Sequence, residues 1–302
     1  MGLNEQRSST TDIIACANQK GGVGKTTTVV NLSAYLARSG RRVLVVDLDP
    51  QGNATSGLGV DKSAVARSVY EALCDEAPLD ELLVPTMVER LDLVPAALSL
   101  AGAEVELAPL RQRERRLSRV LAPLAPRYDH IVIDCPPSLG LLTVNALTAA
   151  GSVLVPLQCE YYALEGLSQL VATINLVRDH LNPTLAVRGV VLTMFDSRTL
   201  LSAQVRDEAR RHLGGAVFDT IIPRSVRLSE APSYGLPIAL YRPESKGAEA
   251  YEALAREFIV RGNPTAGGPP GPLPILASEL LAPEARTPEL PASELLAPEV
   301  LS

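Results

Sequence analysis

The sequence predicts a doubly wound α/β fold, in which a mostly parallel sheet carries helices on both faces. Short apolar runs alternate with helical segments from residue 12 to about residue 261. Several of these runs are apolar almost throughout, as expected for parallel strands that are covered on both sides. The predicted strands, in chain order, are DIIACAN, RRVLVVD, RLDLVPA, DHIVIDC, SVLVPL, VRGVVLTMF and AVFDTII.

Two long segments between these runs read as helices. TTTVVNLSAYLARSG follows a glycine-rich loop and ends at Gly40, a typical helix stop. ALEGLSQLVATINLVRDHL is closed by Asn182 and Pro183. A third segment, Cys135 to Cys159, carries no charge over 25 residues, which raises the question of a membrane span. Because Gly151 and Pro156 interrupt it, a helix, a turn and a buried strand explain it better.

Composition and charge narrow the class of protein. The chain has 302 residues, of which 46% are hydrophobic and 21% charged, as in soluble globular proteins. The polar start MGLNEQRSST lacks an apolar core, so no signal peptide is expected. Four widely spaced cysteines without a CxxC pair argue against a disulfide framework or a zinc site and fit a reducing cytoplasm. A net charge of −6 argues against a polycation that coats nucleic acid.

The chain divides into three parts. Residues 1–11 are expected to be flexible, and residues 12–262 to form the α/β domain. Residues 263–302 contain nine prolines, five Glu and one Arg, and repeat ASELLAPE twice. This Pro-rich, acidic tail is predicted to be disordered and of low complexity, with short docking helices at the two SELLAPE copies as the alternative.

The stretch NQKGGVGKTT lies between the first strand and the first helix, as a phosphate-binding loop must. Its glycines let backbone amides approach an anion, and the helix that follows points its N-terminal amides at it. Lys25 is expected to contact the β- and γ-phosphates of a nucleotide and Thr26 to ligate Mg²⁺. The predicted nucleotide-binding residues are Gly21, Gly22, Val23, Gly24, Lys25, Thr26 and Thr27.

The same loop holds two of the four lysines in the chain, Lys20 and Lys25, among 28 basic residues. KGGVGKTT resembles the deviant Walker A motif of the ParA/MinD/nitrogenase-iron-protein ATPases. That resemblance implies that Lys25 serves the nucleotide of its own subunit and Lys20 reaches the nucleotide of the partner in a sandwich dimer. A lysine supplied in trans would couple ATP hydrolysis to dimerisation, because the transferring phosphoryl group needs fixed positive charge around it.

Three aspartates end predicted strands. Asp47 and Asp49 lie in VVDLDPQGNATSGLG, at the carboxyl edge of the sheet where ligands bind. Asp49 matches the family aspartate that orients or activates the attacking water, while Asp47 supports either Mg²⁺ or the loop. Asp134, in IVIDCPPSLG, resembles the Walker B aspartate, which organises Mg²⁺ through water.

Longer runs resemble the chromosomal ParA/Soj partition ATPases in particular. They cover most of residues 12–262 and include DCPPSLGLLTVNALTA, QCEYYALEGLSQL and IPRSVRLSEAPS. The resemblance implies an ATP hydrolase with weak intrinsic activity, which dimerises around ATP and Mg²⁺ and binds DNA without sequence preference. A ParB-like centromere-binding partner would stimulate hydrolysis. A cytoplasmic, nucleoid-associated protein follows from this reading.

The resemblance also implies positions for the DNA contacts. Arg198 in FDSRT and Arg227 in PRSVRLSE are expected to contact phosphates, with Arg224 as a further candidate. Pro223 is expected to touch the adenine. Arg206 and its neighbours on the same predicted helix alternate with acids and read as an ordinary charged surface.

Other members of the wider family are alternatives. A MinD-like cell-division switch ends in a basic amphipathic helix on the membrane, whereas this C-terminus is acidic and Pro-rich. A nitrogenase-like carrier needs paired cysteines, and none accompanies Cys135. About eleven residues precede the first strand, too few for a helix-turn-helix domain. The MinD-like switch, acting through membrane or protein partners without DNA, is the principal alternative.

Overall fold

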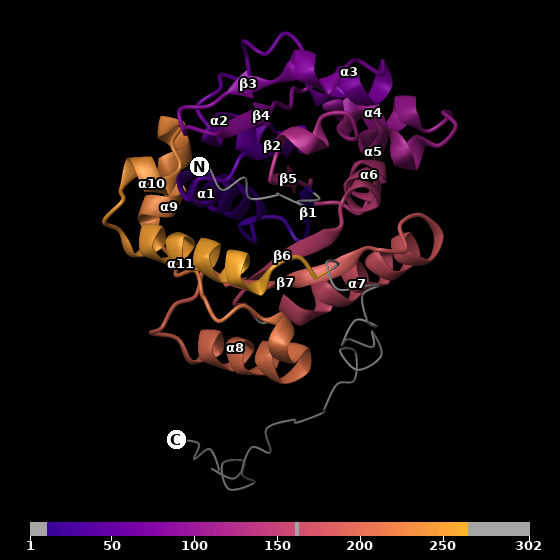
Figure 1. Ribbon diagram of the computed structural model, residues 1–302. Coiled ribbons are helices and arrows are strands. Elements are labelled where there is room, and N and C mark those ends of the chain that lie inside the picture. The colour runs from indigo at the N-terminus through magenta and orange to yellow at the C-terminus, as the bar shows by residue number, and fades with distance from the viewer. Residues whose placement is uncertain (1–10, 161–162, 265–302) are drawn as a thin grey trace, which may run out of the picture.

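The computed structural model describes residues 11–160 and 163–264 as a seven-stranded sheet with helices on both faces (Figure 1). The strand order is β3-β4-β2-β5-β1-β6-β7, and only the β3–β4 pair is antiparallel. The predicted fold class is therefore confirmed. The strands are β1 Asp12–Cys16, β2 Val43–Asp47, β3 Val84–Pro85, β4 Leu91–Val94, β5 His130–Asp134, β6 Ser152–Gln158 and β7 Ala186–Thr193. The predicted N-terminal arm, up to residue 10, and the predicted tail from residue 265 lie outside the described residues.

The helices form two layers. Helices α1, α2, α10 and α11 share one hydrophobic core with the sheet, and α3 to α8 share the other. The predicted helix ends at Gly40 and at Asn182 are confirmed by α1 and α7. The helices are α1 Lys25–Arg38, α2 Asn53–Gly57, α3 Val69–Cys74, α4 Leu100–Leu107, α5 Arg116–Leu121, α6 Leu141–Ala149, α7 Ala163–His180, α8 Leu200–Leu213, α9 Val226–Glu230, α10 Ile238–Tyr241 and α11 Lys246–Arg261.

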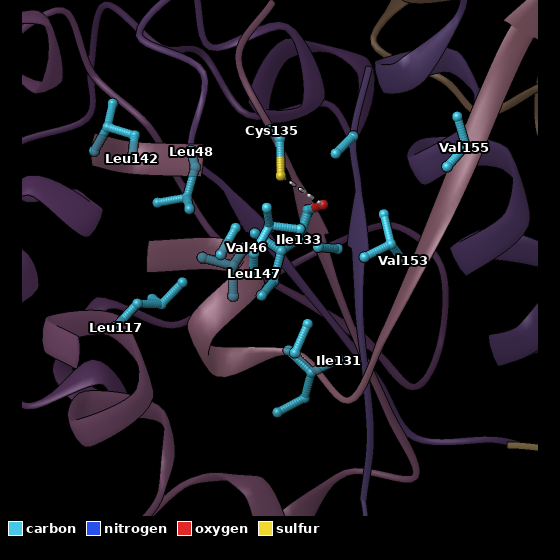
Figure 2. Packing of buried hydrophobic residues seen from close by; sticks show 14 of the residues in the cluster. Val46, Leu48, Leu117, Ile131, Ile133, Cys135, Leu142, Leu147, Val153 and Val155 are labelled. Atoms are coloured by element: carbon cyan, nitrogen blue, oxygen red, sulfur yellow. Dashed lines mark hydrogen bonds between the residues drawn. The ribbon is translucent and has the colours of Figure 1, made fainter. Parts of the chain in front are cut away.

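Both faces of the central strands are buried, which explains their nearly continuous apolar sequences. In β1, Ile14 packs into the core beneath α1 and α11, while Ala15 packs into the opposite core. The side chains of a strand alternate between faces, so a strand covered on both sides needs apolar residues at every position. Figure 2 shows the core that includes Ala15, to which Ile131 and Ile133 of β5 and Leu147 of α6 also contribute. Cys135 lies in this core, and burial raises the pKa of its thiol.

The uncharged segment from Cys135 to Cys159 forms α6 and β6, as the sequence predicted. All seven residues of β6 are buried between neighbours in the sheet. Across residues 11–160 and 163–264, no helix is both long and apolar enough to cross a bilayer.

One predicted strand is wrong. The run AVFDTII, residues 216–222, makes a single isolated bridge to β7, between Val217 and Val190, and no ladder. The amides of Asp219 and Thr220 donate instead to the Glu257 carboxylate of α11, each over 2.8 Å. Because that carboxylate takes the donors that a ladder would use, this run lies beside the sheet edge without extending the sheet. The short antiparallel strand β3 was not predicted, since two residues give no periodicity.

Candidate nucleotide-binding site

The loop between β1 and α1 is shaped to receive an anion. Gly24 caps α1 in the left-handed region, with φ of 88°, and Gly22 has φ of 75°. Side chains rarely adopt this conformation, so glycine is required at both positions. The first turn of α1 has no side-chain cap and no acidic residue. Its backbone N–H groups therefore remain available for a phosphate.

Two side chains that the sequence did not single out hold this loop in place. Asn18 donates from Nδ2 to the Pro156 carbonyl of β6 over 2.7 Å and accepts the backbone N–H of Lys20 over 3.0 Å. Thr193, the last residue of β7, donates from Oγ1 to the Val23 carbonyl over 2.8 Å. The loop is thus fixed to β6 and β7 before any ligand binds. The only sequence signal for these residues was their place at strand ends.

The two lysines of the loop point in different directions. Lys25 is only 6% exposed, and its Nζ folds back to the Lys20 carbonyl at 3.1 Å, across the concave side of the loop. The Lys20 side chain is 39% exposed and pairs through Nζ with Oε2 of Glu160 at 2.9 Å. Lys25 is therefore placed to bind phosphates held by its own loop. Lys20 instead pairs with Glu160, just beyond the end of β6, and remains partly exposed.

Two buried carboxylates lie side by side at the carboxyl edge of the sheet. Asp47 of β2 and Asp134 of β5 are neighbours in register, and both are fully buried. Burial, and then the Asp47 carboxylate, raises the pKa of Asp134 well above its usual range. Burial also raises the pKa of Asp47, to about 6. Uncompensated charge in so dry a place is costly and needs a cation beside it.

The hydrogen bonds divide the roles of these two acids. Asp47 accepts the backbone N–H of Asp49 and both the backbone N–H and the hydroxyl of Thr55, at 2.7–3.1 Å. Its oxygens are thus used in fixing the loop into α2. Both oxygens of Asp134 lack a hydrogen-bond partner within the described part of the chain. Asp134 is therefore the acid that fits a bound cation.

The surroundings of Asp134 suit Mg²⁺ held together with a nucleotide. Thr26, in the first turn of α1, and Lys25 both lie close enough to Asp134 to lower its pKa, the Thr26 side chain more than Lys25. Among the residues that the structure describes, no three His, Cys, Asp or Glu side chains converge as a metal cage. An ion here would take its ligands from the Thr26 hydroxyl, from water on Asp134 and from phosphate oxygens, as Mg²⁺ commonly does.

Asp49 lies just beyond the end of β2. Its Oδ1 accepts the backbone N–H of Gln51 at 2.9 Å, and its carbonyl accepts that of Gly52 at 2.8 Å. The side chain is held by this turn and is 7% exposed, beside the buried pair of acids. The predicted role of Asp49 in positioning water is compatible with this place and stays a prediction.

A cavity of about 420 Å³ opens beside the start of α1. Such a volume lies within the range of small-molecule sites. Its lining includes Gly24, Thr27, Met194, Pro223, Arg224 and Tyr251. The structure thus brings Pro223 to the phosphate loop across 200 residues of chain, as its predicted contact with adenine requires.

The three arginines assigned to DNA lie on neighbouring segments. Backbone bonds join Phe195 to Ile222 and Arg224 to Phe195, at 3.1 and 2.9 Å, and so hold the two segments together. Arg198 is 84% exposed and pairs with Asp196 at 2.7 Å, while Arg227 pairs with Glu230 at 2.7 Å. The Arg198 guanidinium lowers the pKa of Asp196. Both arginines are therefore neutralised by exchangeable surface partners.

Known proteins resemble this chain over most of its length. A family model described as an AAA domain matches residues 11–187. The chain is 59% identical over 250 residues to the sporulation initiation inhibitor protein Soj of Bacillus subtilis, covering 83% of this chain and 99% of that protein. It is 58% identical over 252 residues to the chromosome partitioning protein ParA of Myxococcus xanthus, covering 83% and 89%. The chain belongs to the ParA/Soj family of partition ATPases.

A solved structure extends this assignment to the ligands. Cobyrinic acid a,c-diamide synthase from Mycobacterium smegmatis, with an ATP analogue and magnesium bound, superposes with a TM-score of 0.74 at 42% identity. The match covers 86% of this chain and 98% of that one. The cofactors of this ParA/Soj-family ATPase are ATP and Mg²⁺, as the loop and Asp134 predicted.

Proposed function

We propose that the protein is an ATP-dependent dimerising ATPase that binds DNA without sequence preference in its ATP state. In this proposal it segregates a chromosome or plasmid together with a ParB-like partner that stimulates weak intrinsic hydrolysis, in the cytoplasm on the nucleoid. The observation that carries the proposal is the geometry of the two lysines. Lys25 folds over its own loop, whereas Lys20 is partly exposed and pairs with Glu160, an acid it can leave to serve a second subunit in this proposal.

The proposed chemistry divides between two subunits. Lys25 and the amides of the first turn of α1 bind the phosphates, and Thr26 and Asp134 hold Mg²⁺, which neutralises phosphate charge when bound. Asp49 positions the attacking water. Lys20 of the second subunit leaves Glu160 and places its ammonium where negative charge develops during phosphoryl transfer. Such fixed charge in a water-excluded interface accelerates the reaction, because it does not have to reorganise.

The proposed DNA face comprises Arg198, Arg224 and Arg227. Each arginine would exchange an internal acid or water for a backbone phosphate, which gives affinity without sequence specificity. Arg224 also lines the cavity beside the phosphate loop. One arginine of the proposed face therefore borders the proposed nucleotide site, which supports a link between occupancy of that site and DNA binding. Dimerisation would double the patch and allow a chain with a net charge of −6 to bind DNA.

Binding to an arbitrary DNA duplex tests the proposal, with ATP, with ADP and without nucleotide. We expect binding with ATP alone, and its loss in Arg227→Ala. Arg256→Ala is the matched control, because Arg256 is also exposed and also pairs with an acid on its own helix, Glu252. If Arg227 contacts one phosphate per subunit, its removal should lower the slope of log K against log salt by about 2 in a dimer.

Unchanged binding by Arg227→Ala would remove this face from the proposal. No binding in any nucleotide state would instead favour the MinD-like reading, an ATPase switch that acts through membrane or protein partners.

A further inference from the structure

A second cavity, also of about 420 Å³, lies away from the nucleotide site and shares no lining residue with it. It lies between α5, the turn Ala125–Arg127 and the turn Leu79–Leu82. Its lining combines apolar side chains with three arginines and two acids, Glu76 and Asp80. The residues that matter here are Leu79, Val120, Leu124, Arg116, Arg119 and Arg127.

The cavity is set in the most basic stretch of the chain. Residues 111–127 contain six arginines and one glutamate, in a protein whose net charge is −6. Arg116 pairs with Glu76 at 2.6 Å, yet its Nε is buried without a hydrogen-bond partner. Arg119 and Arg127 are exposed, and neither forms an ion pair within residues 11–160 and 163–264. The cavity thus offers unpaired guanidinium groups around a floor made by the buried Leu79 and Leu124.

This chemistry fits a short acidic peptide with a pair of leucines. We propose that the cavity binds the C-terminal tail of the same chain, through one of its two SELLAPE copies. Each copy places a leucine pair, Leu280–Leu281 or Leu295–Leu296, between two glutamates. The leucines would occupy the apolar floor, and the glutamates would pair with Arg119 and Arg127. Residues 263–302 carry five Glu and one Arg, so their charge is opposite to that of residues 111–127, whose arginines outnumber the two acids in the cavity lining.

The chain can reach the cavity. Phe258 of α11 packs edge-on against His130, the first residue of β5, with ring centroids 5.9 Å apart. The turn Ala125–Arg127 precedes the same strand, so α11 and the cavity both approach the amino edge of the sheet. Twelve residues, 265–276, separate the last described residue from the first ASELLAPE copy. Such a linker spans up to about 40 Å when extended.

Amide hydrogen exchange on the full-length protein tests the proposal. Wild type is compared with a variant in which Leu280, Leu281, Leu295 and Leu296 are changed to serine. The matched control carries serine at four other apolar tail positions, Leu273, Ile275, Leu276 and Leu290. A tethered segment has an effective concentration on the order of 1 mM, so an intrinsic Kd of about 0.1 mM would slow exchange roughly tenfold.

We expect slower exchange over residues 76–80 and 116–127 in wild type and in the control than in the SELLAPE variant. Arg119→Glu combined with Arg127→Glu should abolish the protection, and added salt should weaken it. Equal exchange in all proteins, or protection at another surface, would overturn the proposal. Protection that grows with protein concentration would also overturn it, because it would assign the cavity to the tail of a second copy. The turnover of ATP by each variant checks that the domain is folded.

Discussion

The place of Lys20 leads to a quantitative prediction for Lys20→Ala. In the single chain its ion pair with Glu160 joins side chains that are 39% and 43% exposed. A pair so open to water contributes about 0.5 kcal/mol or less to the free energy of unfolding. The melting temperature of the variant should therefore stay within about 2 °C of wild type. Because Lys25 and the loop amides are untouched, ATP binding should also be retained.

Hydrolysis should respond very differently. A cation supplied in trans to a phosphoryl-transfer site contributes a factor of about 10³–10⁵, or about 4–7 kcal/mol of activation free energy. We therefore expect partner-stimulated turnover by Lys20→Ala to fall by at least about a thousandfold. Lys246→Ala is the control, since Lys246 is an exposed lysine at the start of α11. Turnover equal to wild type would refute the role given to Lys20.

Mixing two inactive variants separates action in trans from action within one subunit. In a dimer of Lys20→Ala with Asp49→Ala, the first subunit keeps its own Asp49 and receives Lys20 from its partner. One complete site is thus formed. Random pairing makes half of the dimers mixed, so turnover should recover to about a quarter of the wild-type rate. No recovery on mixing, in a preparation shown to contain mixed dimers, would mean that Lys20 acts in its own subunit.

Three further predictions concern the site. Asp49→Ala should bind ATP, dimerise and remain on DNA while hydrolysis falls by about 10²–10⁴, and rapid hydrolysis by this variant would refute its role. The pKa of buried Asp134 is raised, so ionisation of this carboxyl destabilises the folded state as pH rises. Without nucleotide, Asp134→Asn should therefore have a free energy of unfolding about 1–3 kcal/mol higher than wild type at pH 7. In urea unfolding this difference should shrink on acidification, and a difference that does not depend on pH would contradict the assignment. Thr193→Val removes the hydrogen bond to the Val23 carbonyl and should weaken ATP binding about fivefold to tenfold by calorimetry, whereas unchanged affinity would show that the loop holds its shape without it.

The central strands and the phosphate loop could be predicted because their signals are local. Burial on two faces forces continuous apolar sequence, and the left-handed backbone at Gly22 and Gly24 forces glycine. The loss of the predicted strand at residues 216–222 had no local signal. It depends on Glu257, on a helix about 40 residues later, whose carboxylate takes two backbone donors.

The hydrogen-bond and ion-pair partners of the site residues also could not be predicted from neighbouring residues in the sequence. Lys20 and Glu160 are 140 residues apart in the chain, and Thr193 is 170 residues from Val23. Such contacts follow from the order of the strands in the sheet, which the sequence alone did not specify. What the sequence did supply were the residues whose chemistry is specific, such as the two lysines and Asp134.

Arg224 lines the cavity beside the phosphate loop and also belongs to the proposed DNA face, so DNA binding can be linked to occupancy of the cavity through this residue. ATP and ADP carry the same adenosine, so a segment that contacts only the adenine, as proposed for Pro223, would respond to either nucleotide alike. The two nucleotides differ at the γ-phosphate, which is expected to contact Lys25 and, in the proposed dimer, Lys20 of the second subunit. Occupancy of the site and the identity of the nucleotide would thus be detected by different residues. If the proposal holds, a single chain responds to occupancy of the cavity, whereas the full response to ATP over ADP requires a dimer.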